Sequence, residues 1–333
     1  MPVTDENTSQ LIAFIENFSK KQPTLPIDDS GLSRILTQAV YISENRTMYT
    51  TRFTLISDII SEADYQARKQ NASAITADIV SQAIEHRRYL QKLPEEKCAQ
   101  MIQQRETVLD VTGKKTGKVN GLAIQDRGYY MFGIPVSVTA QASPGTDGII
   151  NIERESGLSG EIYDKAILII QGLLQRKYAR GIPLALHASI CFEQSYSFVD
   201  GDSASCAEFF ALLSAIAEIP LRQDIAVTGS LNQIGDVQPV GGIPEKISGF
   251  FDTCTILGLT GTQGVIIPRR NLNNILLPER VQKAIEEGIF HIWAIDTFEE
   301  GLHILSEMEP EELAEKISGN LTEYVKLMKN LYK

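Results

Sequence analysis

The pattern of apolar residues changes near residue 106, and this change limits what the chain can fold into. Before it, apolar residues such as Leu11, Ile15 and Phe18 recur at helical spacing, and Pro23 interrupts the pattern. After it, short apolar runs bounded by Gly, Pro and Asp alternate with helical stretches. The sequence therefore predicts an α+β fold, with a helical bundle followed by an α/β domain.

The predicted boundaries follow from this change. Residues 1–105 are expected to be entirely helical, 106–308 to form the α/β domain, and 309–333 to form a charged amphipathic helix. In the first domain, helices are expected over 11–18, from Asp28, over 50–69 and from Thr76. In the second, strands are expected at 108–111, 121–124, 129–140, 148–152, 184–192, 225–228, 264–267 and 291–294. Helices are expected between them at 159–179, 206–219, 244–257 and 278–287.

The stretch Gly113-Lys-Lys-Thr-Gly-Lys118 comes nearest to a phosphate-binding loop. It has one residue too few between its glycines, and Val119 stands where a Mg²⁺-binding Ser or Thr belongs. A basic hairpin turn is the better interpretation, because Asn120-Gly121 follows directly. We therefore expect no nucleotide cofactor in this chain.

Composition excludes several classes of function. A net charge of −11 over 333 residues argues against nucleic-acid binding, which needs clustered Lys and Arg. There is no run of about 18 uncharged apolar residues, and the start MPVTDENTSQ is not a signal peptide, so we expect a cytoplasmic protein without a membrane partner. The cysteines are scattered without a CxxC pair, which predicts reduced thiols and no metal site. They are Cys98, Cys191, Cys206 and Cys254.

The first candidate for chemistry is the acidic turn Val199 to Ser205, which leads into an apolar helical run from Cys206 to Ile219. This places Ser203 at a helix N-terminus, where unpaired backbone N–H groups can hold the oxyanion formed when a hydroxyl attacks an amide carbonyl. The alternative is an ordinary Ser or Asp helix cap. On these residues alone, the ordinary cap is favoured.

The second candidate is Pro239-Val-Gly-Gly-Ile-Pro-Glu-Lys246, a glycine-rich turn that opens the next helix. A lysine at a helix N-terminus lies at the unfavourable end of the dipole, and the apolar neighbours Ile243, Ile247 and Phe250 would desolvate it. Both effects lower the pKa of Lys246, and an amine in this state can act as general base to a serine. The alternative is a solvated surface lysine.

These two stretches together resemble the proteolytic domain of Lon proteases. The resemblance rests on Gly201-Asp-Ser-Ala-Ser205, on Thr228-Gly-Ser230, and on the turn before Lys246, which lies 43 positions after Ser203. The run from Ile219 to Ser230 fits as well, and the similarity covers nearly the whole chain. The A-type has a Pro before the serine, so Asp-Ser-Ala-Ser is similar to the B-type branch.

The resemblance implies a serine endopeptidase that hydrolyses unfolded or damaged proteins. Ser203 would be the nucleophile and Lys246 the general base of a Ser–Lys dyad, with Thr228 orienting the lysine. It also implies a homo-oligomer, most readily a hexameric ring, that confines its sites in a chamber. The alternative is a catalytically silent module that forms a ring or serves as an adaptor.

Upstream, the segment from Glu44 to Asp58 resembles the helical lid domain of the AAA+ ATPase in the B-type branch. Arg52 stands where a nucleotide-sensing arginine would lie. The ATPase core itself is missing, so the chain is either a fragment of a longer protein or a stand-alone member, and the lid favours a fragment. ATP and Mg²⁺ are then expected for the full-length protein, and no cofactor or metal for this chain.

Two carboxylates lie next to the expected nucleophile in the sequence. Asp202 directly precedes Ser203 and Asp200 lies just upstream, and either could pair with Lys246 and raise its pKa. We expect Asp202 in particular to restrain the dyad. His187 is interpreted as structural, because the residues around Ser203 lack the second glycine of a nucleophile elbow. The aromatic residues Trp293, Tyr129, Tyr130, Phe209 and Phe210 are expected in the core.

Overall fold

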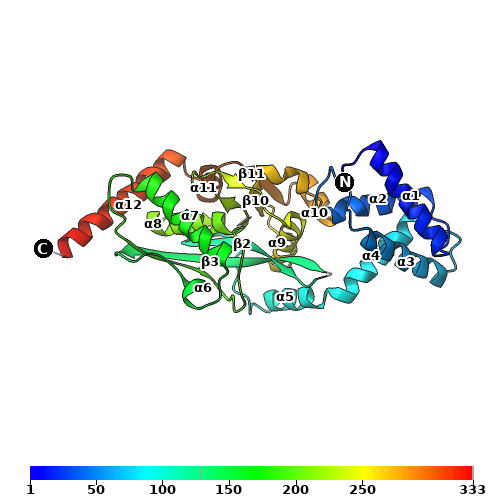
Figure 1. Ribbon diagram of the computed structural model, residues 1–333. Coiled ribbons are helices and arrows are strands. Elements are labelled where there is room, and N and C mark those ends of the chain that lie inside the picture. Colours follow the sequence, from blue (N-terminus) through cyan, green and yellow to red (C-terminus); the bar gives the residue numbers. More distant parts are fainter. Residues whose placement is uncertain (129, 332–333) are drawn as a thin grey trace. The chain divides into compact units, whose positions relative to one another are not determined.

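The computed structural model describes residues 1–128 and 130–331, and it consists of two compact units (Figure 1). Unit 1 contains residues 1–97 together with 127–130 and 273–276, and unit 2 contains the rest of the chain. The predicted class is confirmed: helices come first and a domain of mixed helix and sheet follows. The domain limits at 105/106 and 308/309 stay predictions, and the compact units divide earlier, at 97/98.

Unit 1 is built from amphipathic helices. They are α1 Asp5–Lys21, α2 Asp29–Ile42, α3 Phe53–Lys69, α4 Ala77–Gln91 and the first part of α5 Leu93–Gln103. Three of them start where a side chain caps the first turn: Thr4 accepts from Asn7 N, Asp28 from Gly31 N and Thr76 from Ile79 N. The predicted starts at Asp28 and Thr76 are therefore confirmed. The helices enclose an apolar core that includes Leu11, Ile15, Ile35, Ile56 and Ile60.

Unit 2 is organised around a mixed sheet. The described residues form seven strands in the order β11-β10-β7-β2-β3-β5-β4. Their bounds are β2 Lys118–Asp126, β3 Met131–Pro144, β4 Gly148–Asn151, β5 Leu186–Phe192, β7 Ile225–Val227, β10 Gly264–Pro268 and β11 His291–Ile295. The pairs among β11, β10, β7 and β2 are parallel, β3 is antiparallel to both neighbours, and β4 is parallel to β5. Two small sheets pair β1 Lys114–Thr116 with β6 Pro220–Arg222 and β8 Ser230–Leu231 with β9 Val237–Gln238.

The helices of unit 2 lie against this sheet. After α5 they are α6 Ile152–Glu155, α7 Glu161–Tyr178, α8 Ser205–Ala217, α9 Ile243–Leu257, the 3₁₀ turn η1 Arg269–Asn274, α10 Glu279–Glu286, α11 Phe298–Ser306 and α12 Pro310–Leu331. Gly121 on β2 faces Ala207 of α8, and Gly133 on β3 faces the backbone of α9. Gly133 pairs with Ile124, three residues from Gly121, so the two glycines point to opposite sides. Helices α8 and α9 therefore lie on opposite faces of the sheet.

The main core of unit 2 lies around α8. Nearly every residue from Ser205 to Ala217 is buried, and Phe209 and Phe210 are fully enclosed, as expected. Helix α12 packs onto α8 and buries Leu313, Ile317 and Leu321, so the predicted terminal helix is part of this core. Trp293 is partly buried against it. Tyr129 and residues 332–333, which belong to the predicted strand 129–140 and tail, lie outside the described residues.

The predicted strand at 108–111 is wrong. Its backbone is held by side chains instead of a neighbouring strand: Val108 N donates to Gln194, Asp110 O accepts from Asn120, and Val111 O accepts from Gln263. The basic hairpin turn predicted for residues 113–118 is not formed, because Lys114–Thr116 is strand β1 and pairs with β6 instead of β2. Asn120-Gly121, which supported that prediction, lies inside β2. The turn falls at Gly117, whose φ of +66° suits glycine.

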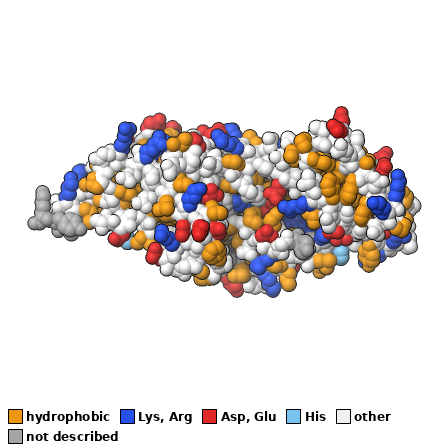
Figure 2. Space-filling view, in the orientation of Figure 1, with side chains coloured by type: hydrophobic (Ala, Val, Ile, Leu, Met, Phe, Trp, Pro, Cys, Tyr) orange, Lys and Arg blue, Asp and Glu red, His pale blue; other side chains and the backbone are white. Residues whose placement is uncertain are grey.

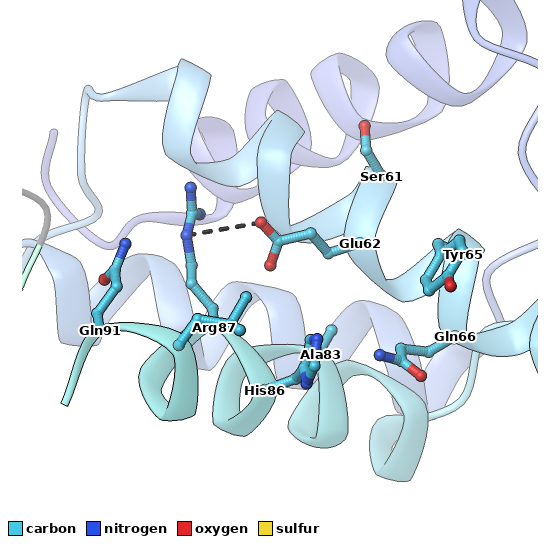
Figure 3. Close-up of a pocket in the computed structure, with 9 residues that line it drawn as sticks. Ser61, Glu62, Tyr65, Gln66, Ala83, His86, Arg87 and Gln91 are labelled. Atoms are coloured by element: carbon cyan, nitrogen blue, oxygen red, sulfur yellow. Dashed lines mark ion pairs between the residues drawn. The ribbon is translucent and has the colours of Figure 1, made fainter. Parts of the chain in front are cut away.

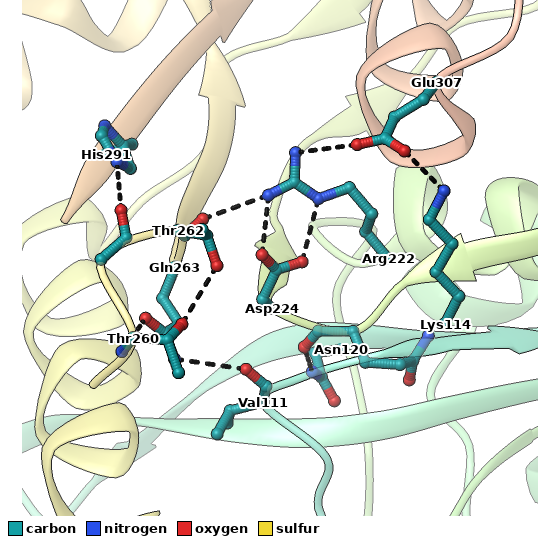
Figure 4. Close-up of polar contacts among 12 residues, drawn as sticks. Val111, Lys114, Asn120, Arg222, Asp224, Thr260, Thr262, Gln263, His291 and Glu307 are labelled. Atoms are coloured by element: carbon teal, nitrogen blue, oxygen red, sulfur yellow. Dashed lines mark hydrogen bonds and ion pairs between the residues drawn. The ribbon is translucent and has the colours of Figure 1, made fainter. Parts of the chain in front are cut away.

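A polar network joins the strands near β6 and β7 (Figure 4). Arg222 forms a bidentate pair with Asp224, at 3.0 and 2.7 Å, and also contacts Glu307, which pairs in turn with Lys114. The side chain of Asn120 donates to Gln223 O at 2.7 Å. Asn120 Oδ1 and Gln223 Oε1 remain buried without a hydrogen-bond partner among the described residues, so the network satisfies only part of the polar groups in the buried turn that leads into β7.

Acidic and basic side chains are interspersed over the face seen in Figure 2. Within the described part of the chain, no helix combines the length and the apolar character that crossing a membrane requires.

Candidate active site

The turn before α8 is fixed by hydrogen bonds to the segment that follows β7. Gly229 N donates to Ser203 O at 2.9 Å, and Cys206 N donates to Gly229 O at 3.2 Å. Leu231 N donates to the Ser205 hydroxyl at 2.8 Å. We call the paired segments 202–206 and 228–231 the serine clamp. It holds the backbone of Ser203 two residues before the first residue of α8.

Lys246 reaches this clamp from the first turn of α9. Gly242 precedes the helix with φ +67°, in the left-handed region, and Pro244 suits the first turn. The helix approaches β3 closely, because a Cβ on Gly133 would lie 2.1 Å from Glu245 O and a Cβ on Gly249 would lie 2.0 Å from Gly133 O. Only glycine at both positions permits this approach, which sets the place of Lys246.

Three predicted residues come together. The Lys246 Nζ lies 3.1 Å from Ser203 Oγ and 3.0 Å from Thr228 Oγ1. The Thr228 hydroxyl donates to Ser203 O at 3.2 Å. Since that proton is used on the carbonyl, the oxygen of Thr228 faces the lysine as an acceptor. Thr228 thus contacts both the amine and the backbone of Ser203.

The environment of Lys246 favours a neutral amine. The residue is 2% exposed, and burial lowers the pKa of Lys246 to about 8, although the Asp202 carboxylate acts in the opposite direction. Among the residues that the structure describes, no carboxylate forms an ion pair with this amine. A minority of Lys246 is therefore unprotonated near neutral pH, but many times more than for a lysine with its ordinary pKa.

The two flanking carboxylates have other partners. Asp202 Oδ2 accepts from the Ser230 hydroxyl at 2.7 Å. Asp200 Oδ1 accepts from Tyr163 N and Gly201 N, at 3.2 and 2.8 Å, so it caps the start of α7. Neither of the two pairings we considered, Asp200 or Asp202 with Lys246, is thus found among the described contacts.

The backbone at Ser203 offers hydrogen-bond donors. Within the described residues, the N–H groups of Asp202, Ser203 and Ala204 meet no protein acceptor. They lie just before α8, where the helix dipole adds positive potential. Donors in this state can bind the negatively charged oxygen of a tetrahedral intermediate.

The other predicted residues belong to other elements of the fold. Arg52 is exposed just before α3, and its guanidinium pairs with no carboxylate that the structure describes. His187 lies on β5 and its Nδ1 contacts Asp147 at 2.8 Å. Tyr130 is half-buried in unit 1, within hydrogen-bond distance of Arg88.

A surface groove lies between α3 and α4 in unit 1, and Figure 3 shows the Arg87–Glu62 ion pair, 3.6 Å long, across it. Its lining is Ser61, Glu62, Tyr65, Gln66, Ala83, His86, Arg87, Leu90 and Gln91. It contains none of the predicted site residues.

Sequence reasoning missed two residues of the site region. Ser230 was noticed only as part of a motif, and nothing in its spacing identified Asp202 as its partner. Glu208, a charged residue in an apolar helix, was a signal that could have been used. It is fully buried, its carboxyl oxygens have no hydrogen-bond partner in the described chain, and Tyr163 OH donates instead to Glu153, at 3.2 Å.

Glu208 predicts an unusual dependence of stability on pH. Burial raises the pKa of Glu208 from 4.5 to about 8, and the nearby Glu153 carboxylate adds to this rise. The folded state binds the proton of Glu208 more tightly than the unfolded state does. The resulting stabilisation of the fold is complete below pH 4.5 and is lost as the pH rises to about 8. We expect wild type to lose roughly a few kcal/mol more than Glu208→Gln between pH 5 and pH 9.

Urea unfolding at a series of pH values measures this difference. The exposed Glu286→Gln on α10 serves as the control and should follow wild type. Parallel curves for wild type and Glu208→Gln would show that Glu208 ionises normally in the folded protein.

Comparison with known proteins agrees with this architecture. Residues 26–89 match the family model of the archaeal LonB AAA+ ATPase lid domain, and residues 190–304 match that of the Lon protease (S16) C-terminal proteolytic domain. A Lon protease homolog of Escherichia coli (strain K12) is 41% identical over 212 residues, which cover 63% of this chain and 36% of that protein. A Lon protease homolog of Haemophilus influenzae is 32% identical over 88% of this chain and 48% of its own length. The archaeal Lon protease of Pyrococcus abyssi is 29% identical over 96% of this chain and 31% of its own length.

By class, the chain is a protein with a Lon-type proteolytic domain, as the matched segment of the α/β domain shows. More particularly, the chain belongs to the Lon protease family, with a LonB-type lid segment before the proteolytic domain. It spans between about a third and a half of the length of these relatives.

Proposed function

We propose that this chain is a serine endopeptidase in which Ser203 is the nucleophile and Lys246 the general base. The observation that carries the proposal is the 3.1 Å contact between Lys246 Nζ and Ser203 Oγ, made by an amine that is almost completely buried. A buried amine with a lowered pKa is one of the known ways to activate a serine hydroxyl.

The first step is attack of Ser203 Oγ on the carbonyl carbon of a peptide bond. Neutral Lys246 has two N–H groups and one lone pair, and one N–H is used on Thr228 Oγ1. The lone pair can then accept the proton of Ser203 as the C–O bond forms. Thr228 keeps the amine in this orientation because its own proton is donated to Ser203 O.

The second step is breakdown of the tetrahedral intermediate. The N–H groups of Ser203 and its neighbours at the start of α8 would hold the oxyanion. Lys246 returns the proton to the leaving amine, the C–N bond breaks, and an acyl-enzyme on Ser203 remains. Water, deprotonated by the same amine, hydrolyses the ester and restores the serine.

Substrate and assembly belong to the same proposal. We expect unfolded or damaged polypeptides as substrates and a homo-oligomer, most readily a hexameric ring, as the working form. In the full-length protein, ATP and Mg²⁺ would act at an ATPase core that this chain lacks, and Arg52 would sense the nucleotide. The chemistry at Ser203 itself uses no nucleotide.

A serine-directed acylating probe tests the proposal. It should label Ser203 in wild type and leave Ser203→Ala unlabelled. Because the amine must lose its proton to act as base, the labelling rate should rise with pH and level off above about 8, the pKa of Lys246. Mass spectrometry of the labelled peptide provides the measurement.

The same experiment tests the rival function, a silent ring-forming or adaptor module. A silent module gives equal, slow labelling of wild type and Ser203→Ala at every pH. Ser197→Ala, which removes an exposed serine from the segment before the site, is the matched control and should label like wild type.

A further inference from the structure

The Ser230 side chain lies at the edge of the site and has one main partner. Ser230 begins β8 and is 3% exposed, and its hydroxyl donates to Asp202 Oδ2 at 2.7 Å. A second acceptor, Gln238 Oε1, lies at 3.4 Å and is the weaker competitor for the single proton. The hydroxyl is therefore committed to the carboxylate.

The serine clamp keeps this hydroxyl in place. On one side of Ser230, Gly229 N bonds to Ser203 O, and on the other side Leu231 N bonds to the Ser205 hydroxyl. Asp202, in contrast, is an exposed residue in a turn, next to a glycine with φ +102°. The donor is thus rigid and the carboxylate has room to move.

The carboxylate has a competing attraction. Lys246 responds to the charge of Asp202. When the amine is protonated, it attracts the carboxylate more strongly than a neutral hydroxyl does. Pairing would occupy the amine that Ser203 needs. The observed structure has Asp202 on Ser230 and Lys246 on Ser203.

We propose that Ser230 is a positioning residue, whose hydroxyl holds the Asp202 carboxylate away from Lys246 and so leaves the amine to Ser203. The inference rests on the proposed Ser–Lys chemistry and adds to it a residue that touches neither substrate nor the reacting atoms.

Few other ionisable groups complicate this competition. The Cys206 thiol of α8 also responds to the Asp202 charge, but burial raises the pKa of Cys206 so far that it stays neutral. On α9, Glu245 is the ionisable neighbour that directly precedes Lys246 in sequence. The neighbours from the segment after β7, Thr228 and Ser230, have no ionisable side chain. A change in the pH profile on removing Ser230 therefore reports on Asp202 and Lys246.

The test is the pH dependence of peptide cleavage in Ser230→Ala. Without the Ser230 hydroxyl, Asp202 should pair with Lys246 and raise the midpoint of the pH–rate profile by about one pH unit. Below the midpoint, this shift corresponds to an approximately tenfold loss of cleavage rate. Cleavage should recover at high pH. Asp202→Asn alone should move the midpoint downward, and the double variant Ser230→Ala/Asp202→Asn should show no upward shift.

Two further variants keep the test decisive. Ser205→Ala removes another hydroxyl of the clamp, one without contact to Asp202, so its midpoint should match wild type whatever its rate. If Ser230→Ala does not fold, Ser230→Cys keeps the volume with a weaker donor and should give a smaller upward shift. An unchanged midpoint in these Ser230 variants, or an upward shift that persists in the double variant, overturns the role of Ser230. Full activity of Ser203→Ala would instead overturn the dyad itself.

Discussion

Ser203→Ala and Lys246→Ala should each reduce cleavage of an unfolded protein at least about a thousandfold, because nucleophile and base act as one unit. Neither change should alter the fold greatly. Among the described residues, the hydrogen-bond partner of Ser203 Oγ is Lys246. Removing the amine of Lys246 also removes the cost of burying a polar group away from water. Cleavage of a fluorescent unfolded substrate and circular dichroism provide the two measurements.

Lys165→Ala is the matched control for the lysine, since Lys165 is exposed on α7 and forms no described ion pair. It should retain wild-type activity. If either Ser203→Ala or Lys246→Ala folds and still cleaves the substrate, Ser203 and Lys246 do not form the catalytic dyad.

Gly133→Ala should have the second largest effect, on both stability and activity. A Cβ at this position would lie 2.1 Å from Glu245 O and 2.7 Å from Lys246 Cα, so α9 must move away from β3. Such overpacking costs about 1 to 3 kcal/mol. A displacement of Lys246 by about 1 Å would reduce the rate about a hundredfold.

Gly172→Ala provides the comparison. Gly172 lies in α7 with no atom within 4 Å of an added Cβ, so alanine there should leave activity unchanged and raise stability slightly. Urea unfolding and cleavage rates of both variants test the difference. If Gly133→Ala behaved like Gly172→Ala, the close approach of α9 to β3 would not determine the position of Lys246.

Local chemistry explains where sequence reasoning succeeded on the fold. The helices at Asp28 and Thr76 were predictable because a capping side chain and an apolar period lie next to each other in sequence. The strand at 108–111 was mispredicted because its hydrogen-bond partners, Gln194 and Gln263 among them, are distant side chains. No local pattern separates a strand from an extended segment held in this way.

The same limit applies to the site. Ser203, Thr228 and Lys246 were predictable candidates because their motifs and spacing resemble a family, and the structure brings their side chains together. The partners of Asp202 and Asp200 were not predictable, since whether a carboxylate faces a lysine, a serine or a helix start is decided by tertiary packing. The role of Gly133 likewise becomes visible only when β3 and α9 are placed side by side.

The serine clamp also governs when the site can exist during synthesis and folding. Ser203 and Lys246 are 43 residues apart, and the clamp residues between them follow β7, an inner strand that needs both β2 and β10 as neighbours. Contacts of such sequence separation form late, because closing the loops costs entropy before the contacts repay it. A partly synthesised or unfolded copy therefore has no assembled nucleophile. Under the proposed chemistry, a chain that fails to fold is inactive toward its neighbours and is itself the kind of polypeptide that folded copies degrade.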